Sequence, residues 1–130
     1  MIIVDTSVWV DYFHDRMTPA AEYLEERRGE ETYLLGDVIL HEVLRGFDDD
    51  RKRRDIVAYL TELRIDPMLG VDRALRSAAR YRALRRRGVT VRKPNDAIIA
   101  SYCIDENLPL LSSDRDFRGY VPLGLELVEG

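Results

Sequence analysis

The amino-acid sequence predicts a three-layer α/β/α sandwich with a central, mainly parallel sheet of four or five strands. Short apolar runs that are typical of buried strands alternate along the chain with longer helical patterns. This alternation favours parallel strands that helices cover on both faces. The chain has 130 residues and contains no repeat and no linker, so it fits one domain spanning residues 1–130.

The first third of the chain contains two predicted strands and two predicted helices. Residues 2–4 are a β-branched run that indicates a buried strand, and Asp5 ends it. Either Thr6 or Ser7 is expected to cap the helix that follows. The next two elements are a helix that begins at a proline and a strand, over residues 19–28 and 32–35.

The middle of the chain is mainly helical. A helix is expected from about Val38 to Phe47, and Glu42 lies beside its apolar stripe, near the middle of the helix. The stripe has the spacing i, i+3, i+4 and i+7 and consists of Leu40, Val43, Leu44 and Phe47. Pro67 indicates that a weak strand over residues 65–69 is short or lies at a sheet edge. Two further helices are expected, around residues 56–63 and over residues 71–84, the second stopping at Gly88.

The stretch from Arg92 to Phe117 combines a buried helix with a buried strand. A proline marks the helix entrance, and Asp96 follows in the first turn. The apolar segment over residues 97–104 continues the helix, and residues 108–111 form a short strand that leads into Ser112 and Asp114. This stretch therefore has one carboxylate at the helix start and another just past the strand end. A last strand is expected over residues 125–128.

Composition narrows the class of protein. The formal net charge is −4, which alone does not indicate a nucleic-acid binder, but residues 73–93 contain nine basic residues and no acid. The single cysteine, Cys103, is expected to fill space in the core. Neither a signal peptide nor a membrane span is predicted, so we expect a cytoplasmic protein with no membrane partner.

Three or four acids would meet at one edge of the sheet if two of the predicted strands are neighbours. In parallel α/β sheets, function gathers outside the carboxyl ends of the strands. Asp5 and Asp114 follow two strands, Asp96 begins the helix before one of them, and Glu42 lies in a helix packed on the sheet. Each acid alone also fits a cap, a turn or an exposed position. Together they converge only if the two strands are neighbours.

Clustered carboxylates need compensation. Two of them about 4 Å apart repel by roughly 4 kcal/mol at an effective dielectric near 20. No lysine or cysteine is expected within these motifs, so protonation or a bound cation must reduce the repulsion. An all-oxygen site suits Mg²⁺ or Mn²⁺, which activate water and neutralise the charge of a scissile phosphate.

These motifs resemble those of the PIN-domain nucleases, and within them of the VapC-type toxins of toxin–antitoxin pairs. The resemblance covers essentially the whole chain through four segments in order: IIVDTSVWVDYF, LHEVLRG, PNDAIIA and LLSSDRDF. It implies a PIN-like fold and a ribonuclease that uses Mg²⁺ or Mn²⁺ and leaves a 5′-phosphate and a 3′-hydroxyl. The implied catalytic and metal-binding acids are Asp5, Glu42, Asp96 and Asp114, and the implied supporting residues are Ser7, Ser112 and Asp116.

The resemblance also implies partners. A VapB-type antitoxin would block the acidic site with its tail, and operator DNA would bind only through that antitoxin. A homodimer and a toxin–antitoxin hetero-oligomer are implied as well. Tyr120, Val121 and Leu123 are apolar candidates for an exposed association surface. The sequence does not indicate which RNA is cut.

The basic stretch is the candidate RNA-binding surface. An acid-free arginine helix that leads towards Asp96 would contact phosphates without reading sequence, although a solvated helix face explains the same charges. The candidate RNA-binding residues are Arg45, Arg82, Arg85, Arg86, Arg87, Arg92 and Lys93.

Other functions fit less well. A phosphatase of the haloacid dehalogenase type needs a second acid two residues after the first, where this chain has Ser7. A receiver domain needs an additional acid and a late lysine, and no glycine-rich phosphate loop is present. The non-enzymatic alternative is a PIN-like binding module that acts mainly through complexes with antitoxin and operator DNA.

Overall fold

The computed structural model describes residues 1–128, which form five strands and seven helices. The strands are β1 (Ile2–Val4), β2 (Tyr33–Gly36), β3 (Arg64–Asp66), β4 (Leu110–Leu111) and β5 (Leu127–Val128). The α-helices are α1 (Thr6–Phe13), α2 (Pro19–Glu26), α3 (Asp37–Arg45), α4 (Asp50–Leu60), α5 (Val71–Arg86) and α6 (Pro94–Glu106). A 3₁₀-helix, η1 (Arg115–Leu123), follows β4.

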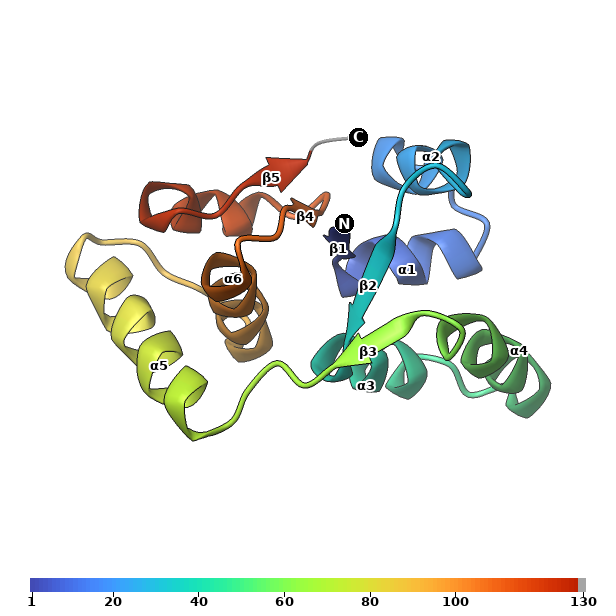
Figure 1. Ribbon diagram of the computed structural model, residues 1–130, viewed down its shortest axis with the longest axis horizontal. Coiled ribbons are helices and arrows are strands. Elements are labelled where there is room, and N and C mark those ends of the chain that lie inside the picture. Colours follow the sequence, from blue (N-terminus) through green and yellow to red (C-terminus); the bar gives the residue numbers. More distant parts are fainter. Residues whose placement is uncertain (129–130) are drawn as a thin grey trace.

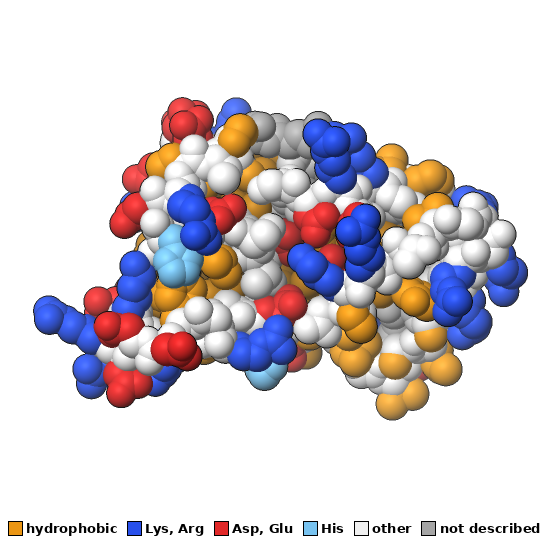
Figure 2. Space-filling view, turned by 180° about the vertical axis from the view of Figure 1, so that it is seen from behind, with side chains coloured by type: hydrophobic (Ala, Val, Ile, Leu, Met, Phe, Trp, Pro, Cys, Tyr) orange, Lys and Arg blue, Asp and Glu red, His pale blue; other side chains and the backbone are white. Residues whose placement is uncertain are grey.

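The sheet is parallel throughout and has the strand order β3-β2-β1-β4-β5. Figure 1 shows α1 to α4 on one side of it and α5, α6 and η1 on the other. The predicted three-layer sandwich with a sheet of four or five parallel strands is therefore confirmed. On the face seen in Figure 2, acidic side chains gather near the centre with Lys and Arg side chains beside them.

The reversal of strand order lies between β1 and β4. The chain adds β2 and β3 on one side of β1, then returns to place β4 and β5 on its other side. The register pairs Ile3 with Leu110 and Val4 with Leu111, and the Asp5 N–H donates to the Leu111 carbonyl at 2.9 Å. The two strands that end next to Asp5 and Ser112 are thus direct neighbours, which the sequence left open.

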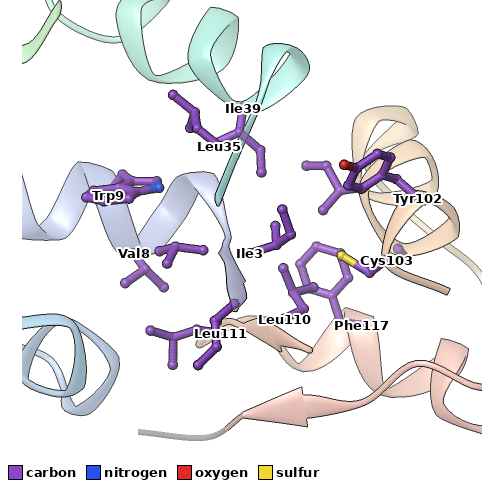
Figure 3. Close-up of a cluster of buried hydrophobic side chains, with 14 of the residues drawn as sticks. Ile3, Val8, Trp9, Leu35, Ile39, Tyr102, Cys103, Leu110, Leu111 and Phe117 are labelled. Carbon is purple, nitrogen blue, oxygen red and sulfur yellow. The ribbon is translucent and has the colours of Figure 1, made fainter. Parts of the chain in front are cut away.

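The core fills both faces of the sheet (Figure 3). Trp9 of α1 and Ile39 of α3 are fully buried on one side, and Phe117 of η1 and Cys103 of α6 are buried on the other. Burial raises the pKa of the Cys103 thiol, so this cysteine is a buried apolar side chain, as predicted. Within residues 1–128, no helix is long and apolar enough to cross a membrane.

Several local predictions are wrong in detail. Neither Thr6 nor Ser7 caps α1, because Asp5 occupies the N-cap position and both hydroxyls donate to carboxylates instead. The stripe of α3 is centred on Ile39 and Val43, its fully buried residues. Strands β3, β4 and β5 cover fewer residues than the predicted ranges. The expectation that the strand near Pro67 is short or lies at an edge is confirmed, because β3 ends before Pro67 at the sheet edge.

The segment after β4 was not predicted as a helix. Its residues coil into η1, which turns Phe117 and Tyr120 into the core, and Tyr120 is fully buried. Tyr120 is therefore not available for association, while Val121 remains 46% exposed. Leu123 is partly buried and packs against the core.

The first half of the basic run holds α5 against α6. Arg76 and Arg80 both pair with Asp105, at 3.2 and 2.8 Å, and Arg73 pairs with Glu106. Residues 73, 76 and 80 share one face of α5, because they lie three and four positions apart. These three arginines therefore have a structural role, and none of them is among the candidate RNA-binding residues.

Replacing the shared acid tests this role. Asp105→Asn should lower the free energy of unfolding by about 1–3 kcal/mol, because the partly buried Arg80 and the exposed Arg76 lose a charged acceptor. Urea unfolding followed by circular dichroism measures the change. Asp48→Asn, in the exposed loop between α3 and α4, is the matched control and should differ from the unmodified protein by less than about 0.5 kcal/mol. Equal effects of the two substitutions would contradict the structural role of Asp105.

Candidate active site

Asp5 is held from two strands at once. It follows β1 and is 4% exposed. Its Oδ2 accepts the Ser7 hydroxyl at 2.7 Å and the Ser112 hydroxyl at 3.1 Å. Ser112 Oγ in turn accepts the Asp114 N–H at 3.0 Å. Burial raises the pKa of Asp5, the two serine hydroxyls lower it, and the nearby Glu42 raises it further.

Glu42 reaches the same edge of the sheet from α3. Its Oε1 accepts the Thr6 hydroxyl at 2.8 Å, and its side chain is neither fully buried nor fully exposed. The adjacent hydroxyls at the start of α1 therefore serve two different acids, Thr6 for Glu42 and Ser7 for Asp5. The prediction of site residues missed Thr6, whose only signal was a hydroxyl residue directly after Asp5.

Asp96 is a buried acid whose pKa is raised by its surroundings. It lies in the first turn of α6, is 6% exposed, and its Oδ2 is buried without a hydrogen-bond partner. Burial, followed by the charge of Asp5, raises its pKa to about 7. Lys93 lowers this pKa, whereas Asp114 and Glu42 raise it. The charges of all three other acids therefore act on the pKa of Asp96, so the four predicted acids lie in one cluster.

Asp114 and Asp116 meet basic residues at the start of η1. Asp114 occupies the N-cap position, where its Oδ1 accepts the Asp116 N–H at 2.9 Å. Lys93 Nζ lies 3.6 Å from Asp114 Oδ2, and Arg92 Nε lies 4.0 Å from Asp116 Oδ2. No lysine lies within the four motifs, but Lys93, directly before PNDAIIA, reaches the cluster from outside them and supplies a compensating charge that was not expected.

The cluster is polar, acidic and only partly compensated. Within residues 1–128, no three His, Cys, Asp or Glu side chains already form an arrangement that would hold a metal ion. A magnesium-type site does not require such a cage, because Mg²⁺ keeps several waters and takes one or two carboxylates together with substrate phosphates. The unpartnered Oδ2 of Asp96 is an oxygen ligand of the kind that such an ion uses.

Cavities lie beside the cluster rather than over it. A small cavity of about 160 Å³ adjoins the acids through Ser112 and Asp114, and Arg115 and Arg118 also line it. A larger cavity of about 680 Å³ lies between α1, α2 and α4 and touches none of the four acids. Acids with strongly shifted pKa values mark a functional site better than the size of a cavity does. We therefore place the candidate site at the sheet edge, where the four acids lie.

Comparison with known proteins adds sequence relatives. The PIN domain family model matches residues 2–121. Over 122 residues the chain is 37% identical to a VapC ribonuclease of Mycobacterium bovis, covering 90% of this chain and 89% of that protein. Ribonuclease VapC11 of Mycobacterium tuberculosis matches to the same extent. This chain belongs to the VapC ribonucleases of the PIN domain family.

Solved structures share the fold of this VapC ribonuclease. DNA-bound VapBC from Salmonella typhimurium superposes with a TM-score of 0.79 at 17% identity, covering 99% of this chain and 98% of that chain. VapBC2 from Rickettsia felis, bound to a fragment of promoter DNA, gives 0.78 at 19% identity, covering 100% and 99%. At such identities the likeness shows the fold alone.

The candidate RNA-binding residues fall into two groups. Arg92 and Lys93 lie beside the acids, through Asp116 and Asp114. The others are distributed over α3, the end of α5 and the residue after it, and their side chains are exposed: Arg45, Arg82, Arg85, Arg86 and Arg87. Their role in RNA binding stays a prediction.

The raised pKa of Asp96 predicts a pH-dependent stability of the metal-free enzyme. Between about pH 4 and pH 7 the folded state binds more protons than the unfolded state, so the free energy of unfolding should fall as the pH rises. Asp96→Asn should flatten this slope without removing it, because the pKa of Asp5 is also raised. Urea unfolding from pH 5 to pH 8 in the presence of EDTA measures it. An unchanged slope in the variant would refute the assignment.

Thr6 is expected to position Glu42. Thr6→Val keeps the side-chain volume but removes the hydroxyl, so kcat for RNA cleavage should fall by roughly ten- to a hundredfold while KM changes little. The free energy of unfolding should change by less than about 1 kcal/mol. Thr6→Ser, which retains the hydroxyl, should recover most of the activity. Unchanged kcat in Thr6→Val would show that the Thr6 hydroxyl does not position Glu42.

Proposed function

We propose that this protein is the toxin of a type II toxin–antitoxin pair and a Mg²⁺- or Mn²⁺-dependent endoribonuclease. The observation that carries the proposal is the buried, unpartnered Oδ2 of Asp96, surrounded by the charges of Asp5, Asp114 and Glu42. Keeping such groups together costs free energy. A bound cation would offset that cost, so a cation site explains why the acids lie together.

The residues present fit a divalent cation. All four acids offer oxygen ligands, which suit Mg²⁺ and Mn²⁺, and Cys103 is buried in the core. Asp5, Asp96 and Asp114 would hold one ion directly or through water. Glu42 would hold a second ion or orient the attacking water. When bound, the ion activates water and neutralises charge on the scissile phosphate.

A carboxylate of this chain can accept the proton that the attacking water loses in the proposed cleavage. Glu42, held by Thr6 through Oε1, would accept a proton from the attacking water through its second oxygen. The water oxygen bonds to phosphorus as the bond from phosphorus to the 3′ oxygen breaks. The 3′ oxygen leaves with the electron pair of the broken bond and takes up a proton from bulk water, so the products are a 5′-phosphate and a 3′-hydroxyl. The hydroxyls of Ser7 and Ser112 would hold the Asp5 carboxylate in place during cleavage.

Basic side chains at the end of α5 support an RNA substrate. Arg85 and Arg86 are exposed in its last turn, and Arg87 follows directly after it. Within residues 1–128, none of these three arginines forms an ion pair, in contrast to the arginines that hold α6. Such groups would position the RNA backbone without selecting a sequence. Their contribution should weaken as salt increases.

Relatives with the same fold support a protein partner. The structures from Salmonella typhimurium and Rickettsia felis are VapBC assemblies bound to DNA. We infer that a VapB-type antitoxin binds this chain, and that operator DNA is bound through that antitoxin. A homodimer is also expected, and exposed apolar residues available for it include Val71, Leu75 and Val121. A toxin that acts on RNA in this way would act in the cytoplasm.

Metal removal tests the proposal. The purified protein should cleave single-stranded RNA in the presence of Mg²⁺ or Mn²⁺, lose activity with EDTA and regain it when the ion is restored. Asp96→Asn should reduce cleavage to background at saturating metal while retaining the native circular dichroism spectrum. Gel analysis of 5′-labelled RNA measures both effects.

A control variant tests whether the loss of activity is specific to the acids of the site or follows from replacing any acid. Asp55→Asn, at an exposed position of α4, should leave cleavage unchanged. Cleavage by Asp96→Asn at the unmodified rate would overturn the assignment of the site. Antitoxin binding without RNA cleavage in any metal would instead indicate a binding module.

A further inference from the structure

Lys93 lies at the N-terminus of α6, a position where a positively charged side chain is unfavourable. It is the N-cap residue, with φ −107° and ψ 118°, and its carbonyl accepts the Asp96 N–H at 3.0 Å. The following Pro94 restricts Lys93 to this extended backbone. A helix N-terminus is unfavourable for a cation, because the helix dipole places partial positive charge there. Something nearby must therefore favour a lysine at this position.

The acidic cluster supplies that favourable interaction. Lys93 Nζ lies 3.6 Å from Asp114 Oδ2. Partial burial opposes the charge of Lys93, but Asp96, Asp114 and Asp5 together raise its pKa above the ordinary value. The same lysine lowers the pKa of Asp96. Lys93 is thus the counterion of Asp114, one of the four acids to which we assign metal binding, and its charge also acts on the neighbouring Asp96.

The contact is one that a divalent cation can replace. The Lys93 side chain is 65% exposed and has a flexible four-carbon stem. An exposed single ion pair contributes little to stability, because water screens it. A divalent cation on the same carboxylates carries twice the charge and repels the ammonium group. The lysine then has to move away, and its fixed backbone keeps it next to the site.

We propose that Lys93 is a tethered cation that exchanges with the metal: it neutralises part of the acidic cluster before a divalent ion binds, and afterwards contacts an RNA phosphate. This inference rests on the proposed metal-dependent function of the site. It assigns Lys93 two successive partners, first Asp114 and then the substrate. Lys93 is accordingly a positioning and charge-compensating residue in the metal-free protein and a phosphate contact in the complex.

Direct binding of Mn²⁺ tests the exchange independently of cleavage. With EDTA-stripped protein in isothermal titration calorimetry, Lys93→Met should bind Mn²⁺ about three- to tenfold more tightly than the unmodified protein, because a repelling charge is gone. Lys93→Arg, which keeps the charge, should bind with nearly the unmodified affinity. Lys52→Met removes the other lysine of the chain, on α4, and should have no effect.

Thermal unfolding gives a second readout. Without metal, Lys93→Met should have a lower Tm than the unmodified protein, because the repulsion among the acids is less compensated. At saturating Mn²⁺ this difference should shrink, since the ion replaces the lysine. RNA cleavage at saturating Mn²⁺ should nevertheless be about tenfold slower in Lys93→Met, because a phosphate contact is lost.

The outcomes separate this inference from the proposed function. Mn²⁺ affinity that is unchanged or weaker in Lys93→Met, with normal binding by the unmodified protein, would overturn the exchange and leave the metal site standing. Failure of the unmodified protein to bind Mn²⁺ would overturn the metal site and the exchange together. Tighter binding in Lys93→Met combined with slower cleavage is the result that supports both.

Discussion

The parallel pairing of β1 with β4 is the constraint on which the rest of the site depends. The two strands lie far apart in the sequence, yet Val4 pairs with Leu111, so the residues that follow them are side by side. This register lets Ser112 donate to Asp5 and brings the start of η1, with Asp114, to the same edge. A shift of one residue would turn these side chains to the opposite faces of the sheet. The apolar core around both strands opposes such a shift.

Keeping these acids together lowers the stability of the metal-free protein. Burial and mutual repulsion raise the pKa of Asp96 to about 7, a sign that its charged form is disfavoured in the metal-free protein. Three hydroxyls and one ammonium group reduce the strain, from Ser7, Ser112, Thr6 and Lys93. None of them satisfies Asp96 Oδ2. The compensation is therefore incomplete at the oxygen best placed to take a metal ion.

The sequence predicted the architecture from general rules, and it predicted that the acids meet only on the condition that the strands before Asp5 and Ser112 are neighbours. Alternating strands and helices fix a parallel sheet, and acids that follow strands gather at its carboxyl edge. The face of α5 formed by Arg73, Arg76 and Arg80 was also readable from helical spacing, but its acidic partners at the end of α6 were not. Their partners depend on how α5 packs against α6.

Other features required the three-dimensional structure. The Thr6 hydroxyl can cap a helix or reach across to Glu42, and only the packing of α1 against α3 decides between these alternatives. The burial of Tyr120 follows from η1, whose 3₁₀ geometry has no strong sequence signature. The contact between Lys93 and Asp114 depends on the loop before α6 and the start of η1 meeting in space.

The central claim is that the β1–β4 edge forms one cation site, and the location of a bound Mn²⁺ tests it most directly. In crystals soaked in MnCl₂, an anomalous difference map should place Mn²⁺ between Asp5 and Asp96, with Asp114 coordinating directly or through water. The Oδ2 of Asp96 should be among the ligands. A map with Mn²⁺ only at other carboxylates, or with none at this edge at saturating concentration, would contradict the account.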